Sequence, residues 1–386
     1  MIITYKYRFY PNEKQKIIIN NTYFIIRKYW NKLLKEKIEH NIKYNSILMH
    51  DIKNIKIEEK ALGKSEYDFS SILNSLFQLN ELFSRNTRKN IPLKYKTEFD
   101  NQTFFINNNT DRISITNNLI VDKRLGILKV SYSREIPSDA AIKKITILKT
   151  KTNKYFLCIS FFIKEKDKNK IDIDNAIGLD YSISHFYIDS NGRSRDLFCD
   201  NDFIIERIKI KKLFIELKNK ISGSSNYNKI YQKILKYNIK IKNKRNDILH
   251  KESSELVKKY DIISVESLSA KEIANHNNID IKTGYRYHFG KQVYDSSYQT
   301  FIKYLEYKCN LYGKVFIAID KYFPSSKICN SCGYYNKLEL ELSKRIIICP
   351  KCGKRYNRDI NAAKNIRDKG VKEYISTQIK SVSNKT

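Results

Sequence analysis

The chain has 386 residues, of which 41% are hydrophobic, and this is enough for two or three domains with apolar cores. Its longest nearly apolar stretch, Tyr155 to Ile163, is far too short to cross a bilayer, so we expect no membrane span and no membrane partner. The 73 lysine and arginine residues outnumber the 41 aspartate and glutamate residues, which gives a formal net charge of +32. A compact protein with this excess repels itself unless a polyanion neutralises it, so the composition predicts a large nucleic acid as the partner.

The N-terminal part of the chain begins as a strand and continues as helices. Residues 2–10 alternate as in a strand, and apolar residues then recur at helical spacing from 13 to about 38 and again over roughly 67–88. Residues 39–66 match neither pattern. From 91 to 165 the chain changes to short alternating runs with Asn-rich turns, which predicts a small antiparallel β-barrel. We expect the first strand to complete this barrel, with the helices inserted between.

The C-terminal part alternates strands with helices. The predicted elements are a strand beginning at 176–189 with a turn at Ser190–Gly192, two long basic amphipathic helices at 201–221 and 228–259 that form a hairpin through 222–227, a buried strand at 260–268, a helix at 292–312, a strand within 311–320, and a helix from Asp359 to about Arg367. The last residues, about 371–386, are polar, and we expect a flexible tail there.

Four cysteines form two C-x2-C pairs, Cys329 with Cys332 and Cys349 with Cys352, and residues 333–348 bridge the pairs. This spacing presents four thiolates to one tetrahedral ion, which predicts a structural Zn²⁺ ion in a zinc ribbon. The alternative is a pair of disulfides. The start of the chain does not resemble an export signal, so we expect a cytoplasmic protein, and disulfides are rare in a reducing cytoplasm. The remaining cysteines are expected to be inert thiols: Cys158, Cys199 and Cys309.

Three acidic residues interrupt apolar or small-residue surroundings. Asp180 lies in the strand sequence IGLD, Glu266 ends the strand sequence IISVE, and Asp359 begins the last predicted helix. A charge in an apolar strand is costly unless it is paired or bound to a metal ion. Salt bridges to lysines would explain any one of these acids alone. Together, at two strand positions and one helix start, they indicate an RNase H-like nuclease, and the chain order of β-hairpin, helix, strand and helix also fits an RNase H-like core.

The chemistry of such a site is phosphodiester hydrolysis with two metal ions. Aspartate and glutamate supply hard oxygen ligands, and Mg²⁺ keeps open positions for water and phosphate oxygens. One ion would make the hydroxide and the other would stabilise the leaving 3′ oxygen. Three neighbouring carboxylates would repel one another without the ions, and the N-terminal end of the last helix would help to hold Asp359 ionised.

Five segments of the chain together match a pattern that is more specific than any single motif. They are Tyr5–Arg8 with Tyr10, Pro11 and Gln15; Arg27 with Trp30 and Asn31; the N-x-R-x-D-x-x-H-K run of Asn243, Arg245, Asp247, His250 and Lys251; Phe323–Lys327 before Cys329; and Arg358–Asp359 with Asn361–Ala363, Asn365 and Ile366. In these segments the chain resembles TnpB, the transposon-encoded family of RNA-guided nucleases that is ancestral to type V CRISPR effectors. The resemblance spans about residues 5–367 and is more specific in the C-terminal half.

The resemblance implies a RuvC-type nuclease in which Asp180, Glu266 and Asp359 are the catalytic ligands of Mg²⁺. It also implies a guide RNA made from the end of the mobile element, and target DNA with a short transposon-adjacent motif that the N-terminal barrel and helices recognise. We expect a monomer with its RNA, associated with the nucleoid. The expected fold class is multidomain α/β: an RNase H-like RuvC core at 173–321 and 357–370, an inserted zinc ribbon at 322–356, a wedge-type β-barrel at 1–12 and 91–172, and a helical recognition insert at 13–90.

The resemblance also suggests which side chains contact nucleic acid, namely Arg358, Lys327, Arg245, Lys251, Tyr5, Arg8 and Arg27. The chain departs from the family pattern at Ser182, Ser267 and Asn357, none of which removes a predicted metal ligand, and Asn357 can still cap the last helix. Three alternatives remain open. They are a non-cutting RNA-guided repressor, an RNase H-like transposase or resolvase that works without RNA, and a zinc-ribbon nucleic-acid-binding protein without chemistry.

Overall fold

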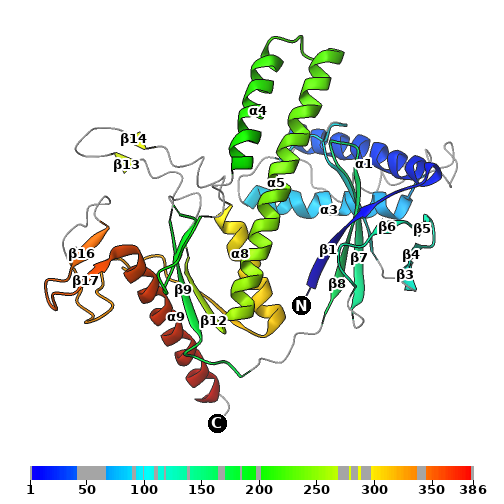
Figure 1. Cartoon of the computed structure of the whole chain (residues 1–386). Helices are drawn as coiled ribbons and strands as arrows, with labels where there is room; N and C mark the ends of the chain where they lie inside the picture. Colours follow the sequence, from blue (N-terminus) through cyan, green and yellow to red (C-terminus); the bar gives the residue numbers. More distant parts are fainter. Residues whose placement is uncertain are drawn as a thin grey trace. The chain divides into compact units, whose positions relative to one another are not determined.

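The structure is a computed structural model of the chain (Figure 1). It describes residues 2–40, 67–88, 93–98, 100–107, 112–116, 119–136, 140–163, 170–182, 185–196, 201–267, 278–279, 286–287, 297–336 and 345–383. The chain divides into two compact units, residues 1–164 and 165–386, and each is described by itself. The predicted mixture of helices and strands is confirmed. Within the described ranges, no helix combines the length and apolar character that a bilayer crossing needs.

The described residues of the first unit form two helices and two antiparallel sheets. Its helices are α1 (Glu13–His40) and α3 (Phe69–Arg88). The larger sheet has the strand order β2 (Gln102–Asn107), β7 (Ala141–Lys149), β8 (Tyr155–Phe162), β1 (Ile2–Phe9) and β6 (Val130–Ser131), and the smaller sheet has the order β3 (Ile113–Thr116), β4 (Leu119–Asp122) and β5 (Gly126–Leu128).

Strand β1 lies inside the larger sheet although it comes first in the chain. It pairs with β8 along its whole length, from Ile2 opposite Phe162 to Phe9 opposite Tyr155. The prediction that the first strand joins the later strands, with the helices inserted between, is therefore confirmed. Rings and aliphatic side chains from both sheets and both helices form one apolar core, with Tyr7, Phe9, Ile26, Leu76 and Ile120 among its fully buried members.

The prediction of a single small barrel needs correction. The described strands pair as an open five-stranded order that ends at β2 and β6, and as a separate three-stranded sheet. The alternating run 126–132 is divided at Lys129, whose carbonyl accepts a hydrogen bond from the Tyr10 backbone N–H at 2.9 Å. This division assigns β5 and β6 to different sheets. Residues 41–66, most of the segment that matched no pattern, lie outside the described residues.

The second unit contains a mixed five-stranded sheet. Its order is β11 (Ser194–Arg195), β10 (Tyr187–Asp189), β9 (Ala176–Tyr181), β12 (Ile262–Glu266) and β15 (Val315–Ile319). Strand β10 is antiparallel to both of its neighbours, whereas β9, β12 and β15 run parallel. The predicted turn after β10 is present, and Gly192 has the positive φ of 87° that this turn requires. Two two-residue strands, β13 (Asn278–Ile279) and β14 (Arg286–Tyr287), pair only with each other among the described strands.

Helices cover both faces of this sheet. Helix α5 (Ser225–Lys259) and helix α8 (Tyr298–Tyr312) pack on the face that carries Ile177, Leu179, Ile263 and Val265, and together they form a second apolar core. Helix α9 (Arg358–Ser383) packs against β9 and β12 (Figure 1). Helix α4 (Asn201–Lys218) forms the predicted basic hairpin with α5, and the Ser224 side chain caps α5 by accepting a hydrogen bond from Tyr227 N.

The contact between α9 and the sheet depends on glycine. A Cβ atom at Gly178 of β9 would lie 2.1 Å from the Ala363 backbone oxygen of α9, and one at Gly370 of α9 would lie 2.0 Å from Ser264 Oγ of β12. Gly178 and Ser264 are direct partners in the parallel register. Since side chains on one face recur every second residue, Asp180 and Glu266 lie on the same face, toward α9.

Helix α9 is longer than predicted, and the predicted flexible tail from about 371 is wrong as far as Ser383. The helix continues through Gly370. The absence of a side chain at this position permits close packing against Ser264. Before α9, strands β16 (Ile346–Ile348) and β17 (Arg355–Asn357) form an antiparallel pair.

The substitution Gly178→Ala tests this packing. The new methyl group meets helix backbone, which cannot rotate away, so we expect the free energy of unfolding to fall by about 1–3 kcal/mol or more, as for other overpacked sites. Urea unfolding of the full chain measures the change.

The chain offers a matched control at the other close contact. Gly370→Ala meets the Ser264 side chain instead of backbone. We therefore expect Ser264→Gly to restore most of the stability that Gly370→Ala removes. Unchanged stability of Gly178→Ala would show that α9 does not depend on this glycine.

Candidate active site and cysteine centre

The sheet register brings Asp180 and Glu266 to the same level. Val265 of β12 pairs with Leu179 of β9, and the two acids follow these partners at the carboxyl ends of their parallel strands. Asp359 lies in the first turn of α9, the helix that packs on this face. The negative charges of Glu266 and Asp359 both act on the Asp180 carboxyl group. The structure thus places the three predicted ligands near one another at one end of the sheet, on the side of α9.

Mutual repulsion characterises this group of acids. Burial, followed by the negative charges of Glu266 and Asp359, raises the pKa of Asp180 well above its usual value, while Arg358 and Arg345 act in the opposite direction. Burial also raises the pKa of Glu266. A bound cation would relieve both effects, because it stabilises the ionised form of each carboxyl group.

Two observations indicate that these residues fit a hard divalent cation. The donor set consists of carboxylate oxygens, the ligands that Mg²⁺ prefers. In addition, the Tyr298 hydroxyl is buried without a hydrogen-bond partner among the described residues. Burial and the charges of Asp180 and Glu266 raise the pKa of Tyr298, so its hydroxyl lies within the field of the two acids. A hydrated ion would provide both the missing positive charge and hydrogen-bonding water.

Asp359 is held by arginines and by its helix. Arg345 Nη1 lies 2.6 Å from Asp359 Oδ2, and Arg358 Nε lies 3.4 Å from Asp359 Oδ1. Asn357 Oδ1 accepts hydrogen bonds from the backbone N–H groups of Asp359 at 2.9 Å and Ile360 at 3.2 Å. The predicted capping by Asn357 is confirmed. The sequence analysis did not identify Arg345. Its position follows from the pairing of β16 with β17, next to which Arg358 N donates a hydrogen bond to Arg345 O at 2.8 Å.

Glu266 is held by a serine from the segment that leads into the cysteines. Ser325 Oγ donates a hydrogen bond to Glu266 Oε1 at 2.5 Å. Ser325 is buried, with 6% of its surface exposed. This partner was also missed, since no local pattern links residues that are 59 positions apart.

The four cysteines meet at one point. Their Sγ atoms lie within 4.8 Å of one another. Tetrahedral coordination with Zn–S bonds of about 2.3 Å places sulfur atoms about 3.8 Å apart. The two shortest cross-pairs, Cys329 to Cys352 at 3.9 Å and Cys332 to Cys349 at 3.6 Å, match this spacing. The thiolates therefore fit a Zn²⁺ ion and do not form disulfides.

Helix α9 connects this centre to the acids. Asn361 Nδ2 donates to the Ile328 carbonyl at 2.6 Å, and Asn361 Oδ1 accepts from Asn330 N at 2.9 Å. Asn365 Nδ2 donates to the carbonyls of Ser325 at 2.8 Å and Ile328 at 2.7 Å. Both asparagines are buried. One helix thus carries Asp359 at its start and binds the first cysteine turn along its side.

The residues predicted to contact nucleic acid lie in varied surroundings. In the first unit, Tyr5 packs on the Phe161 ring, Arg8 donates to the Tyr155 carbonyl at 2.7 Å, and Arg27 lies over the Phe24 ring. In the second unit, exposed Lys251 pairs with Asp247 at 2.7 Å, Arg245 and Lys327 are half-buried, and Arg358 is buried beside Asp359. Arg358 and Lys327 are thus the two candidates near the acids and the cysteines.

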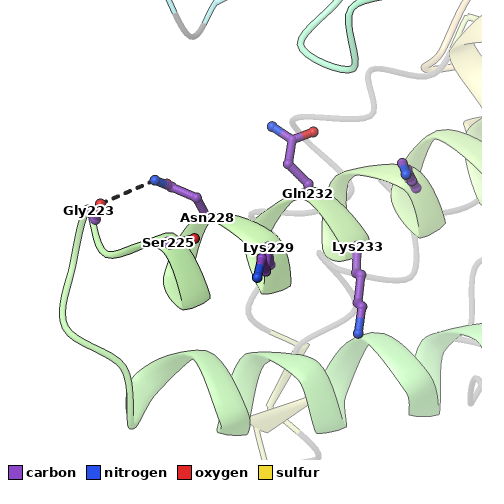
Figure 2. A pocket seen from close by; sticks show the side chains of 7 residues that line it. Gly223, Ser225, Asn228, Lys229, Gln232 and Lys233 are labelled. Atoms are coloured by element: carbon purple, nitrogen blue, oxygen red, sulfur yellow. Dashed lines mark hydrogen bonds between the residues drawn. The ribbon is translucent and has the colours of Figure 1, made fainter.

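The α4–α5 hairpin carries a basic groove. The sequence analysis predicted the basic hairpin but not which of its residues line a groove. Figure 2 shows the side chains that line it at the start of α5. Its volume is about 770 Å³, and its lining is Gly223, Ser225, Asn228, Lys229, Gln232, Lys233 and Lys236. A second groove of about 600 Å³ runs on between the helices and is lined by Lys209, Lys212, Leu213, Lys233, Lys236, Tyr237 and Lys240. Together they form a continuous lysine-rich surface.

Three family models match the sequence in separate regions. Residues 1–42 match a model described as a helix-turn-helix domain, residues 160–277 match one described as a probable transposase, and residues 298–366 match one described as a Cas12f1-like TNB domain. The second match contains Asp180 and Glu266, and the third contains the four cysteines and Asp359.

Curated relatives align over much of the chain. A putative RNA-guided DNA endonuclease of Streptomyces pristinaespiralis is 25% identical over 95% of this chain and 89% of its own length. The putative RNA-guided DNA endonuclease InsQ of Escherichia coli K12 is 23% identical over 65% of this chain and 61% of its own length. The TnpB-like protein L79 of Acanthamoeba polyphaga mimivirus is 27% identical over 58% of this chain, which spans only 42% of L79.

Among solved structures, a Cas12f1–sgRNA–target DNA complex aligns with 95% of this chain and 98% of its own, at 14% identity and a TM-score of 0.48. The fold of each unit is defined by the strand order and register within this chain.

Replacement of one zinc ligand tests the cysteine centre. Cys329→Ser removes a thiolate, so we expect the zinc content to fall well below one ion per chain and the second unit to melt at a lower temperature. Elemental analysis of the purified protein measures the zinc. Cys158→Ser, in the first unit, is the matched control and should retain it. An unchanged zinc content in Cys329→Ser would contradict the assignment.

Proposed function

From the premise that the chain belongs to the TnpB family, we propose that it is an RNA-guided DNA endonuclease of a mobile element, which cuts target DNA beside a transposon-adjacent motif. The observation that carries the proposal is the meeting of Asp180, Glu266 and Asp359 at the strand ends and the start of α9. The names of the Streptomyces and E. coli relatives, which are given as putative RNA-guided DNA endonucleases, support the same activity.

The strand order supports an RNase H-like RuvC core at 173–321 and 357–370. The β9–β10 hairpin, the α4–α5 helices, β12, α8 and β15 follow the chain order expected for that core. The cysteine segment, 322–356, falls between β15 and α9, as expected of a zinc ribbon inserted into the nuclease. In the first unit, the sheet that contains β1 is the proposed wedge, and α1 and α3 belong to the proposed recognition insert.

Asp180, Glu266 and Asp359 are proposed to hold two Mg²⁺ ions. When bound, these ions supply Lewis acidity to the attacking water and to the leaving 3′ oxygen. The protein's part is to orient the three carboxylates and to keep Asp180 and Glu266 ionised, although burial raises the pKa of both. Arg345 and Arg358 neutralise part of this charge and hold Asp359, and Ser325 holds Glu266. The water oxygen would form a new bond to phosphorus and lose a proton to solvent while the bond between phosphorus and O3′ breaks, and the leaving O3′ would take a proton from solvent.

The charge distribution supports guide RNA and target DNA as the partners. A formal net charge of +32 calls for a polyanion, and the lysine-rich grooves of the α4–α5 hairpin provide one extended surface for it. The lysines there contact phosphate groups, so this surface contributes affinity but not sequence recognition. Sequence recognition is assigned to base pairing with the guide RNA.

Single replacements of the acids test the nuclease. In Asp180→Ala, Glu266→Ala or Asp359→Ala, loss of a metal ligand should abolish cutting of a plasmid that matches the guide RNA, while binding of RNA and DNA is retained. A plasmid cleavage assay with Mg²⁺ and a gel-shift assay measure the two properties. Asp174→Ala, an exposed acid just before β9, is the control and should cut normally.

The same experiment separates the alternatives. Matched binding without cutting by the unmodified protein would favour a repressor. Cutting or joining of element ends without RNA would favour a transposase or resolvase. Normal turnover in any of the three variants would contradict the ligand assignment.

Two lysine pairs on one helix test the hairpin surface. Lys229 and Lys233 line the groove, whereas Lys258 and Lys259 lie at the other end of α5. Lys229→Gln with Lys233→Gln should weaken nucleic-acid binding. The slope of the logarithm of the binding constant against the logarithm of the salt concentration should become shallower by about 0.7–0.9 for each phosphate that a lysine no longer neutralises. Lys258→Gln with Lys259→Gln is the control. Equal effects of the two pairs would show that the groove has no special role.

A further inference from the structure

Building on the proposed nuclease, we propose that Ser325 is a positioning residue through which the zinc ribbon orients Glu266 for binding of the catalytic metal ions. Ser325 belongs to neither the acids nor the cysteines. It lies between β15 and the first cysteine turn, and its hydroxyl reaches the strand end that carries Glu266.

The first step is the hydrogen bond itself. Glu266 is the last residue of β12 and pairs with Ile319 of β15, one position beyond the last pair of β12 with β9. Its side chain therefore lies at the strand end, where its three rotatable bonds allow several orientations of the carboxylate. Ser325 Oγ lies 2.5 Å from Oε1 and donates to it, which favours one orientation of the carboxylate and favours its ionised form. Within the described part of the chain, Oε2 receives no hydrogen bond, so this oxygen is available as a metal ligand.

The second step is what holds Ser325. Its carbonyl accepts a hydrogen bond from Asn365 Nδ2 at 2.8 Å, and its backbone N–H donates to Phe323 O at 2.8 Å. Asn365 also binds the carbonyl of Ile328, the residue before the zinc ligand Cys329. The segment from Ser325 to Cys329 is therefore held at one end by α9 and at the other by the cysteine centre.

The third step is the consequence for metal affinity. Removal of a residue that orients a metal ligand typically lowers metal affinity by about 10–100-fold. Zinc folds the turn that begins at Cys329, so loss of zinc would release Ser325 and, with it, Glu266. The structural ion and the catalytic ions are thus linked through five consecutive residues, 325–329, and one hydrogen bond.

The alternative is that Ser325 only helps the ribbon to fold. Ser325→Ala distinguishes the two roles, because it removes the hydroxyl and leaves the backbone groups that contact Asn365 and Phe323. Ser326→Ala is the matched control in the adjacent position, and Ser325→Thr keeps a hydroxyl.

The measurement is titration of the full-length, zinc-loaded protein with Mn²⁺ alone, followed by electron paramagnetic resonance. Asp180→Ala defines the signal that belongs to the acid site. Ser325→Ala should bind Mn²⁺ about 10–100-fold more weakly at that site, as expected for loss of an orienting partner, and should keep its zinc. Ser326→Ala should match the unmodified protein, and Ser325→Thr should recover most of the affinity. Zinc removal from the unmodified protein should weaken Mn²⁺ binding as Ser325→Ala does.

A second readout separates this proposal from the proposed function. In the cleavage assay, Ser325→Ala should raise the Mg²⁺ concentration that gives half-maximal cutting, and saturating Mg²⁺ should restore most of the rate. Unchanged Mn²⁺ affinity in Ser325→Ala, or loss of its zinc, would overturn the positioning role. If the unmodified protein binds Mn²⁺ as described but cuts no matched DNA, the nuclease proposal fails while the positioning role stands.

Discussion

The close approach of α9 to strands β9 and β12 is the contact on which the rest of the second unit depends. It is possible because Gly178 has no side chain at the point where the backbone of α9 passes. The helix meets the sheet face that carries both strand-end acids, and its first turn therefore delivers Asp359 to Asp180 and Glu266. On the opposite face, Phe301 and Leu305 of α8 provide ordinary apolar packing. One face of the sheet thus provides apolar packing, and the other carries the two strand-end acids beside Asp359.

The same helix also organises the cysteine centre. Along its side, Asn361 and Asn365 bind three backbone groups, namely the Asn330 N–H and the carbonyls of Ser325 and Ile328. Buried amides of this kind satisfy backbone groups that have no partner in a strand or helix, so their positions are strongly constrained. Because Asp359 lies on the first turn of that helix, the same helix holds both the cysteine segment and the acid. Ser325 adds a second link, which reaches Glu266 without passing through Asp359.

The features that could be predicted from the sequence are those encoded over short distances. The two C-x2-C pairs predicted the four-sulfur centre, and an acid at the end of an apolar run predicted the places of Asp180 and Glu266. The features that were missed depend on pairing between distant segments. Arg345 reaches Asp359 only because β16 pairs with β17, and the division of residues 126–132 between two sheets follows from a hydrogen bond to Tyr10. The length of α9 was missed for a similar reason, since its packing against β12 at Gly370 is a tertiary contact.

The position of α9 in the chain has a consequence during translation. Strands β9 and β12 leave the ribosome long before residue 359 is made, so the growing polypeptide carries two of the acids without the third. In the full chain α9 covers the sheet face at Gly178 and Ser264, and this cover is absent until α9 has been made. Under the proposed assignment, a nascent chain that stops before Asp359 would lack one of the three metal ligands, although its basic helices α4 and α5 would already be complete. Under the proposed function, the order of synthesis would by itself delay DNA cutting until residue 359 has been added.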